Sequence, residues 1–160
     1  MADLMKGKRG LVMGVANERS IAWGIARAMA DEGAELAFSY QGEALEKRVR
    51  PLAAEVGSDF LIPCDVSDMG LLDATFDAVA AKWGRLDFVV HAIGFSDKNE
   101  LRGGYVDTTL ENFLLTMNIS AYSFVAVAKR ARALMPAGGS LLTLSYYGAE
   151  KVIPHYNVMG

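Results

Sequence analysis

The 160-residue sequence contains one cysteine, two histidines and four prolines. Cys64 has no partner for an internal disulfide, which predicts a reducing, cytoplasmic setting. With two histidines, one cysteine and no tight cluster of carboxylates, the sequence offers no ligand set for a protein metal site. We therefore expect neither a disulfide nor a bound metal.

The sequence also lacks an excess of positive charge and any long apolar run. Its 16 Lys and Arg residues stand against 19 Asp and Glu, so no basic surface for nucleic acid is expected. No apolar run approaches the ~20 residues of a membrane span, and the first six residues have no apolar signal core. A hydrophobic content of 52% is typical of a folded globular chain, and the length suits one modest domain.

Short apolar runs alternate along the chain with segments of helical spacing. The apolar runs predict five strands, over residues 10–13, 35–40, 59–63, 86–91 and 140–145. The helical spacing predicts four helices, over residues 20–32, 43–56, 68–83 and 108–134. We expect Pro51 to kink or split the second helix, and a polar loop to cover residues 94–106.

The alternation of strands and helices predicts an α/β fold with one parallel sheet. Strands that are apolar throughout are covered on both faces, and right-handed crossovers then favour a Rossmann-like, doubly wound sheet of strand order 3-2-1-4-5. Ligands of such sheets bind beyond the carboxyl ends of the strands, near the switch between strands 1 and 4. Functional side chains are therefore expected at the strand ends.

The turn after the first strand runs from Gly14 to Ser20 and Ile21. A glycine allows a sharp turn, and the following helix N-terminus offers N–H groups and partial positive charge to a diphosphate. However, Ser20 and Ile21 stand where the common G-x-G-x-x-G pattern would have further glycines. An ordinary turn with Ser20 as helix N-cap therefore stays an equal alternative.

The second strand is followed by the neutral Gln41, where an acidic residue commonly binds the adenosine ribose and an arginine would accommodate a 2′-phosphate. Lys47 and Arg48 lie a turn or two further on, and the absence of an arginine directly after the strand weakly favours NADH over NADPH. After the third strand, Asp65 can accept from an adenine amino group while Val66 packs on the ring. The alternative is that Asp65 only caps the next helix, as Ser67 or Asp68 could also do.

Two further groups follow strands 4 and 5. The fourth strand ends in His91 and small residues that would let a cofactor pass close to the backbone, and His91 itself is more typical of a hydrogen-bonded structural histidine. After the fifth strand come Tyr146 and Tyr156, ten residues apart. A phenol can stabilise a developing oxyanion without carrying charge, although tyrosines after a strand are most often packing residues.

Together these segments resemble the bacterial NADH-dependent enoyl-[acyl-carrier-protein] reductases, a divergent branch of the short-chain dehydrogenase/reductase superfamily. The similarity runs along the whole chain. The separated Ser20-Ile21-Ala22 and the Tyr146/Tyr156 pair distinguish this branch from the ketoreductases of the superfamily. The segments that carry the resemblance are residues 7–16, 20–22, 33–38, 64–66, 91–95, 141–146 and 153–160.

The resemblance implies roles for particular residues. Tyr156 would be the catalytic tyrosine, Tyr146 an accessory active-site tyrosine, and Ser96 a residue facing the acyl substrate. The residues implied to contact NADH are Gly14, Ser20, Ile21, Gln41, Asp65, Val66 and Ile93.

The implied reaction is the last reduction of each fatty-acid elongation cycle, on an enoyl thioester carried by acyl carrier protein. NADH would give hydride to C3, and Tyr156 would hydrogen-bond the resulting enolate. The resemblance also implies a homotetramer and no membrane partner.

The chain departs from this family after Tyr156. Relatives have a lysine seven residues after the catalytic tyrosine, and that position lies three residues beyond Gly160. We therefore expect residues 1–160 to be the N-terminal portion of a single larger NAD-binding domain of about 260 residues, with strand 5 as an exposed apolar edge. Two alternatives stay open: a nucleotide-binding fragment without turnover, and a 3-oxoacyl thioester ketoreductase.

Overall fold

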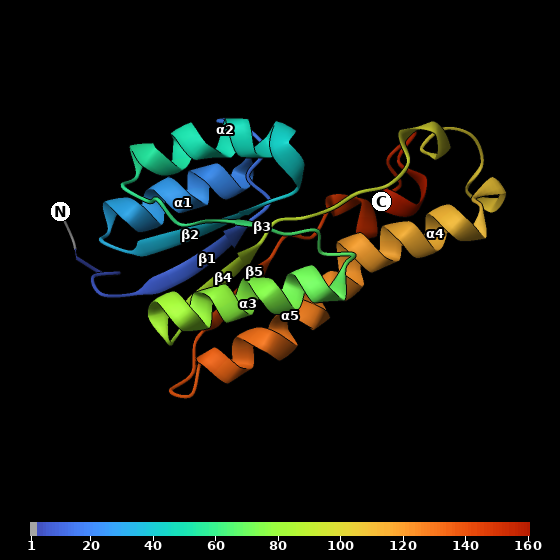
Figure 1. The fold of residues 1–160 in the computed structure, drawn as a ribbon. Coiled ribbons are helices and arrows are strands. Elements are labelled where there is room, and N and C mark those ends of the chain that lie inside the picture. The colour runs from blue at the N-terminus through green and yellow to red at the C-terminus, as the bar shows by residue number, and fades with distance from the viewer. Residues whose placement is uncertain (1–2) are drawn as a thin grey trace.

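The computed structural model describes residues 3–160. Met1 and Ala2, the first two residues of the segment considered for a signal core, lie outside the described residues. The described chain forms one five-stranded parallel sheet in the order β3-β2-β1-β4-β5 (Figure 1), which confirms the predicted doubly wound topology. The strands are β1 (Arg9–Met13), β2 (Glu35–Tyr40), β3 (Leu61–Pro63), β4 (Phe88–His91) and β5 (Ser140–Thr143).

Helices cover both faces of this sheet. Figure 1 shows α1 and α2 on one face and α3 and α5 on the other, while α4 projects beyond the sheet with the C-terminal segment beside it. The helices are α1 (Ile21–Asp31), α2 (Gly42–Glu55), α3 (Met69–Trp83), α4 (Leu110–Met117) and α5 (Ser123–Ala131). Among the described residues, no helix is both long enough and apolar enough to cross a membrane.

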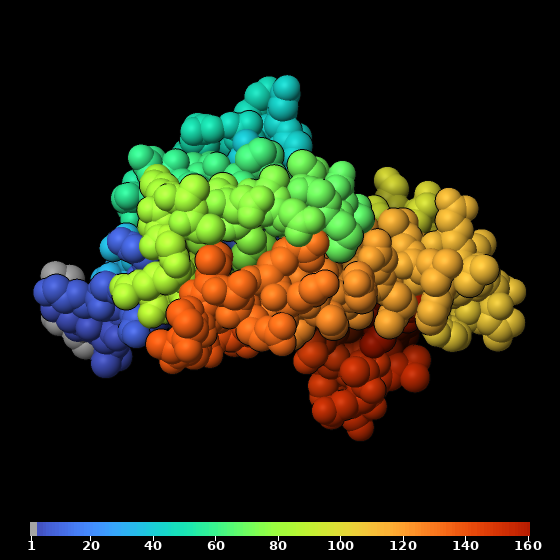
Figure 2. Space-filling model, turned by 60° about the horizontal axis from the view of Figure 1, so that its bottom comes forward, coloured from blue at the N-terminus to red at the C-terminus, as the bar shows by residue number. Residues whose placement is uncertain are grey.

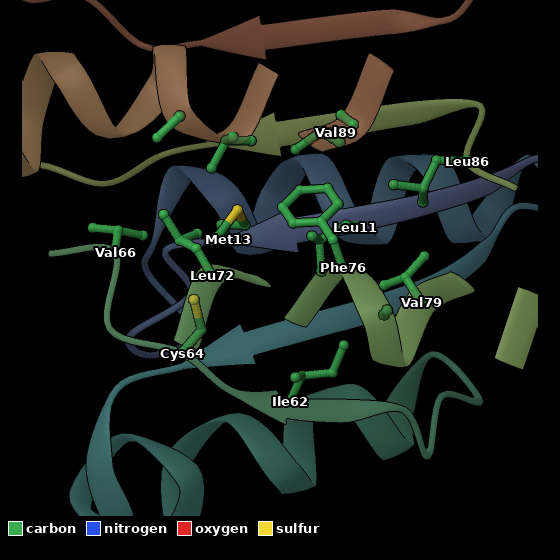
Figure 3. Packing of buried hydrophobic residues seen from close by; sticks show 14 residues of the cluster. Leu11, Met13, Ile62, Cys64, Val66, Leu72, Phe76, Val79, Leu86 and Val89 are labelled. Atoms are coloured by element: carbon green, nitrogen blue, oxygen red, sulfur yellow. The ribbon is translucent and has the colours of Figure 1, made fainter. Parts of the chain in front are cut away.

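The two faces of the sheet build two separate apolar cores. Successive side chains of a strand point to opposite faces, so Leu11 and Met13 pack toward α3 and α5 while Val12 packs toward α1 and α2. Figure 3 shows Leu72 and Phe76 of α3 lying over Leu11 and Met13. Burial on both faces explains why the strands read as continuous apolar runs.

Two predicted helices differ from the structure. Pro51 neither splits α2 nor ends it, and because Pro51 is exposed, water can bind the Lys47 carbonyl that loses its intrahelical donor. The single helix expected over 108–134 begins at Leu110, capped by the Thr109 side chain, and a π-helical turn divides it at Asn118–Tyr122. β1 and β2 span at least their predicted residues, whereas β3, β4 and β5 are each two residues shorter than predicted.

β5 forms the edge of the sheet, as expected. Within the described residues it pairs only with β4, and all four of its residues are exposed. Its Leu141 and Leu142 side chains therefore present an apolar edge strand to solvent, a surface that favours association with another chain.

His91, at the end of β4, is fully buried and hydrogen-bonded, which supports its interpretation as a structural histidine. Its Nε2 lies 2.7 Å from Ser123 Oγ, and its Nδ1 lies 3.2 Å from Thr143 Oγ1. Because the Ser123 hydroxyl donates to the Ile119 carbonyl at 2.6 Å, its oxygen must accept from His91. Nε2 therefore carries a proton, and burial lowers the pKa of His91, which favours the neutral ring.

This lowered pKa predicts a loss of stability in acid. The unfolded histidine titrates near 6.5, so between the lowered pKa of the folded state and about pH 6.5 the unfolded chain binds more protons than the folded chain. Within this range, the free energy of unfolding decreases as the pH is lowered, by up to about 1.4 kcal/mol per pH unit. We expect His91→Gln to lose this contribution in urea unfolding between pH 7.5 and 5, whereas substitution of the exposed His155 retains it. Equal pH dependence of His91→Gln and the unsubstituted protein would contradict the assignment.

Candidate functional site

A cleft of about 430 Å³ lies beyond the carboxyl ends of β1 to β4, at the predicted position. Its volume is within the range of about 300–1,000 Å³ that is typical of small-molecule sites. The residues that line it are Gly14, Val15, Ala16, Ser39, Tyr40, Gln41, Leu45, Cys64, Asp65, Val66, Ala92, Ile93, Gly94, Phe95 and Ile119.

Gly14 directly follows β1 and lies against Ala92, which directly follows β4. Its φ is +104°, in the region that favours glycine, and a Cβ placed on it would lie 2.1 Å from the Ala92 carbonyl oxygen. On the same strand pair, the Ala92 N–H donates to the Met13 carbonyl at 2.9 Å. Glycine at this position therefore permits both the close approach of the two chain segments after β1 and β4 and the turn that follows β1.

Ser20 shapes the loop that leads from Gly14 into α1. Its Oγ accepts from the N–H groups of Ala16 at 3.0 Å and Asn17 at 3.1 Å, and it makes no cap bond to the helix. Ile21, the first residue of α1, is 66% exposed. Ser20 and Ile21 do not line the cleft, but Ala16, which Ser20 holds, does. The first N–H groups of α1 have no intrahelical partner.

Asp65 and Gln41 meet at the β2–β3 end of the cleft. Gln41 Nε2 donates to Asp65 Oδ2 at 2.6 Å, and Asp65 Oδ1 accepts from the Ser67 N–H and hydroxyl at 2.9 and 2.6 Å. Partial burial acts to raise the pKa of Asp65, but the hydrogen bonds from Ser67 and Gln41 outweigh it and hold the pKa below its usual value. Asp65 is thus a carboxylate beside the lining residue Val66.

The cap of α3 is Asp68, one of the capping residues that the sequence offered. Its carboxylate accepts from the N–H groups of Gly70 at 2.8 Å and Leu71 at 3.1 Å. Asp65 therefore does not cap the helix, and its contact with an adenine stays a prediction.

The opposite end of the cleft is apolar. Ile93, Gly94 and Phe95 follow β4 there, and Ile119 contributes from the π-helical turn. Leu45 and Ile119 come from helices, so a search of strand ends could not find them. Ser39, Tyr40, Cys64 and Ala92 also escaped prediction as lining residues, although their positions at strand ends were a usable signal.

Cys64 is not a reactive group of this cleft. Its thiol is buried, and burial raises the pKa of Cys64. Within residues 3–160, no group of three or more His, Cys, Asp or Glu side chains is placed to hold a metal ion.

Ser96 points toward α4. Its hydroxyl lies 2.8 Å from Thr116 Oγ1 and 3.1 Å from Asn112 Nδ2, and both of those side chains are buried. Ser96 does not line the cleft. Its role toward an acyl substrate stays a prediction.

The structure brings Tyr146 and Tyr156 together. Their rings stack with centroids 4.7 Å apart and planes 23° apart. Next to Tyr156, the Asn157 amide donates to the Glu100 carbonyl at 2.8 Å and joins the C-terminal segment to the loop after β4. Neither tyrosine is among the residues that line the cleft, so their catalytic roles stay predictions.

Comparison with known proteins identifies the family. The family model for enoyl-(acyl carrier protein) reductase matches residues 14–160. The chain belongs to this reductase family. One curated relative, enoyl-[acyl-carrier-protein] reductase [NADH] 2 of Rhizobium meliloti, is 67% identical over the whole of this chain.

Solved reductase structures share the fold. The crystal structure of FabI from Candidatus Liberibacter asiaticus has a TM-score of 0.97 at 55% identity and covers 99% of this chain. The Anaplasma phagocytophilum reductase in complex with NAD has a TM-score of 0.96 at 59% identity and covers the whole chain. This chain covers 62% of each of those two chains and 60% of the Rhizobium reductase.

The close approach at Gly14 predicts opposite effects for two glycine substitutions. Gly14→Ala places a Cβ against the Ala92 carbonyl at a strained φ, so we expect the free energy of unfolding to fall by at least about 2 kcal/mol. Gly24 lies inside α1 with open space where a Cβ would stand, so Gly24→Ala is expected to raise it by about 0.5–1 kcal/mol. Urea unfolding measures both, and a tolerated Gly14→Ala would contradict this account.

Proposed function

We propose that this protein, like the relatives it matches, reduces the C2–C3 double bond of an enoyl thioester on acyl carrier protein with NADH. The observation that carries the proposal is the cleft beyond the carboxyl ends of β1 to β4, lined by five of the seven residues expected to contact the nucleotide. Support for the reaction class comes from the Rhizobium relative, which is named as an NADH-dependent enoyl reductase.

The residues of the cleft fit a dinucleotide. The start of α1 and the Gly14–Ala16 backbone suit the pyrophosphate, because helix N-termini attract anions. Asp65, held ionised, can accept from the adenine amino group beside Val66, and Gln41 can reach the adenosine ribose. The apolar end at Ile93 suits the nicotinamide. When bound, NADH supplies the hydride for reduction.

The two stacked tyrosines suit the substrate side. As C3 is reduced, negative charge develops on the thioester oxygen, and the Tyr156 hydroxyl would donate a hydrogen bond to it. Tyr146 would hold the ring of Tyr156 through the stacking contact. After protonation at C2 the product is the saturated acyl thioester. The role of Ser96 near the acyl chain and the single-domain organisation of residues 1–160 stay predictions.

The surface of the long helix favours a homo-oligomer, a tetramer in the full family arrangement. Leu110, Leu114 and Val125 of α4 and α5 are 73%, 57% and 60% exposed, and Figure 2 shows the two helices following one another on the surface, with α5 beside α3. Apolar exposure of this kind is typical of an association surface. The single thiol of Cys64 is consistent with the expected cytoplasmic location.

NADH consumption with two thioesters tests the proposed reaction. We expect the protein to oxidise NADH with crotonyl thioester and not with acetoacetyl thioester. The reverse preference would identify a ketoreductase instead. Binding of NADH without consumption of either substrate would indicate a nucleotide-binding chain without turnover, and would contradict the proposal.

Tyr156→Phe tests the oxyanion contact. Loss of one such donor typically lowers turnover by about 10²–10³-fold, so we expect kcat with crotonyl thioester to fall by that factor while NADH affinity changes little. Tyr147→Phe is the matched control, since Tyr147 lies in the same segment, is 60% exposed and does not line the cleft. An equal loss of turnover and NADH binding in Tyr156→Phe would count against this role.

A further inference from the structure

The long helix beside the cleft is interrupted where it passes the apolar end. α4 and α5 are joined by a π-helical turn over Asn118–Tyr122, which we call the π-turn. One extra residue in a turn rotates the following helix by about 100° relative to an uninterrupted helix. Turns of this kind occur frequently at functional sites, and hydrogen bonds from two serines hold this one in place.

One contact joins the π-turn to the loop after β4. Ser120 Oγ accepts from the Phe95 N–H at 3.0 Å and lies 3.2 Å from the Phe95 carbonyl oxygen, to which it donates. A single hydroxyl thus satisfies both backbone groups of one residue. The Phe95 side chain is 51% exposed, so packing holds this residue weakly and the two hydrogen bonds fix its backbone.

A second contact joins the end of the π-turn to β4 itself. The Ser123 hydroxyl donates to the Ile119 carbonyl inside the π-turn and accepts from the buried His91. His91 and Phe95 are four residues apart, so the π-turn is attached on either side of the strip Ala92–Ile93–Gly94.

The strip Ala92–Ile93–Gly94 forms one wall of the cleft. Ala92, Ile93 and Gly94 all line it, and Ile119 lines it from the π-turn. A Cβ added to Gly94 would be in van der Waals contact with Met159 Cε at 3.6 Å and Ser120 Oγ at 3.8 Å, so both side chains lie beside the strip. The geometry of this wall therefore depends on the contact between Ser120 and Phe95.

We propose that Ser120 is a positioning residue for the reduction, holding the Ile93–Gly94–Phe95 backbone in the geometry that places the nicotinamide. This inference rests on the proposed function. Ser120 acts through the Phe95 backbone, so its loss should impair the reacting end of the cofactor site and leave the adenosine end, at Gln41 and Asp65, unaffected.

Substitution of Ser120 by alanine and threonine tests the proposal. We expect Ser120→Ala to lower kcat for crotonyl thioester by about 10- to 100-fold, as small misplacements of reacting groups do, with ADP-ribose affinity unchanged. Ser120→Thr keeps the hydroxyl and should recover at least a third of the rate.

A second serine provides a matched control. Ser58 Oγ donates to the Leu36 carbonyl at 2.6 Å and accepts from the Phe60 N–H at 3.2 Å, at the opposite end of the strands from the cleft. Ser58→Ala therefore removes a comparable pair of bonds without touching the site, and should leave kcat unchanged. An equal loss of kcat in Ser58→Ala and Ser120→Ala would overturn the proposal, because a general loss of structure would then explain both.

Two readouts do not require turnover. Ser120→Ala should increase hydrogen exchange at the Phe95 amide, and it should lower the affinity for NAD⁺ relative to ADP-ribose, since only NAD⁺ carries the nicotinamide. If the unsubstituted protein binds NAD⁺ but reduces no enoyl thioester, the proposed function fails while these readouts still decide the role of Ser120. An unchanged ratio of NAD⁺ to ADP-ribose affinity, or an unchanged kcat, would overturn the inference.

Discussion

The site depends on the close approach of β1 and β4 at their carboxyl ends. Gly14 and Ala92 lie so near each other that no side chain fits on Gly14, and the chain turns there at a φ of +104°. This contact fixes where the loop to α1 and the strip after β4 begin. Both segments line the cleft, so two parts of its lining start from one backbone junction. The strand order then places this junction at the switch point of the sheet.

Hydroxyl groups, more than charges, hold the walls of the cleft. Ser20 binds two N–H groups of the first loop, Ser67 binds Asp65, and Ser120 binds Phe95. Among the described residues that line the cleft, Asp65 is the one with a formal charge. A site built in this way can receive an anionic dinucleotide through backbone N–H groups without a cluster of basic side chains.

The sequence was sufficient for the sheet and for the strand-end part of the site. Buried parallel strands are apolar throughout, so β1, β2 and β4 stood out, and the residues after them followed from the topology. Gly14, Gln41, Asp65 and Val66 follow from these strand ends, the resemblance to the reductases adds Ile93, and all five line the cleft. The boundaries of β3, β4, β5 and the long helix were less accurate, because they depend on side-chain contacts and not on periodicity.

Other features could not be predicted because they depend on contacts between distant segments. The π-turn has the same helical spacing of apolar residues as its neighbours, and its hydrogen bonds to Phe95 and His91 appear only in the folded chain. The stacking of Tyr146 on Tyr156 depends likewise on how the C-terminal segment folds back, where Asn157 binds the Glu100 carbonyl across 57 residues of chain. Local patterns identified these tyrosines but not their distance from the cleft.

A crystal structure of the protein with NAD⁺ bound tests the central claim most directly. The account predicts the adenine beside Asp65 and Val66, the pyrophosphate at the Gly14–Ala16 turn and the start of α1, and the nicotinamide against Ile93. A dinucleotide bound outside this cleft, or bound with its adenine at the Ile93 end, would contradict it.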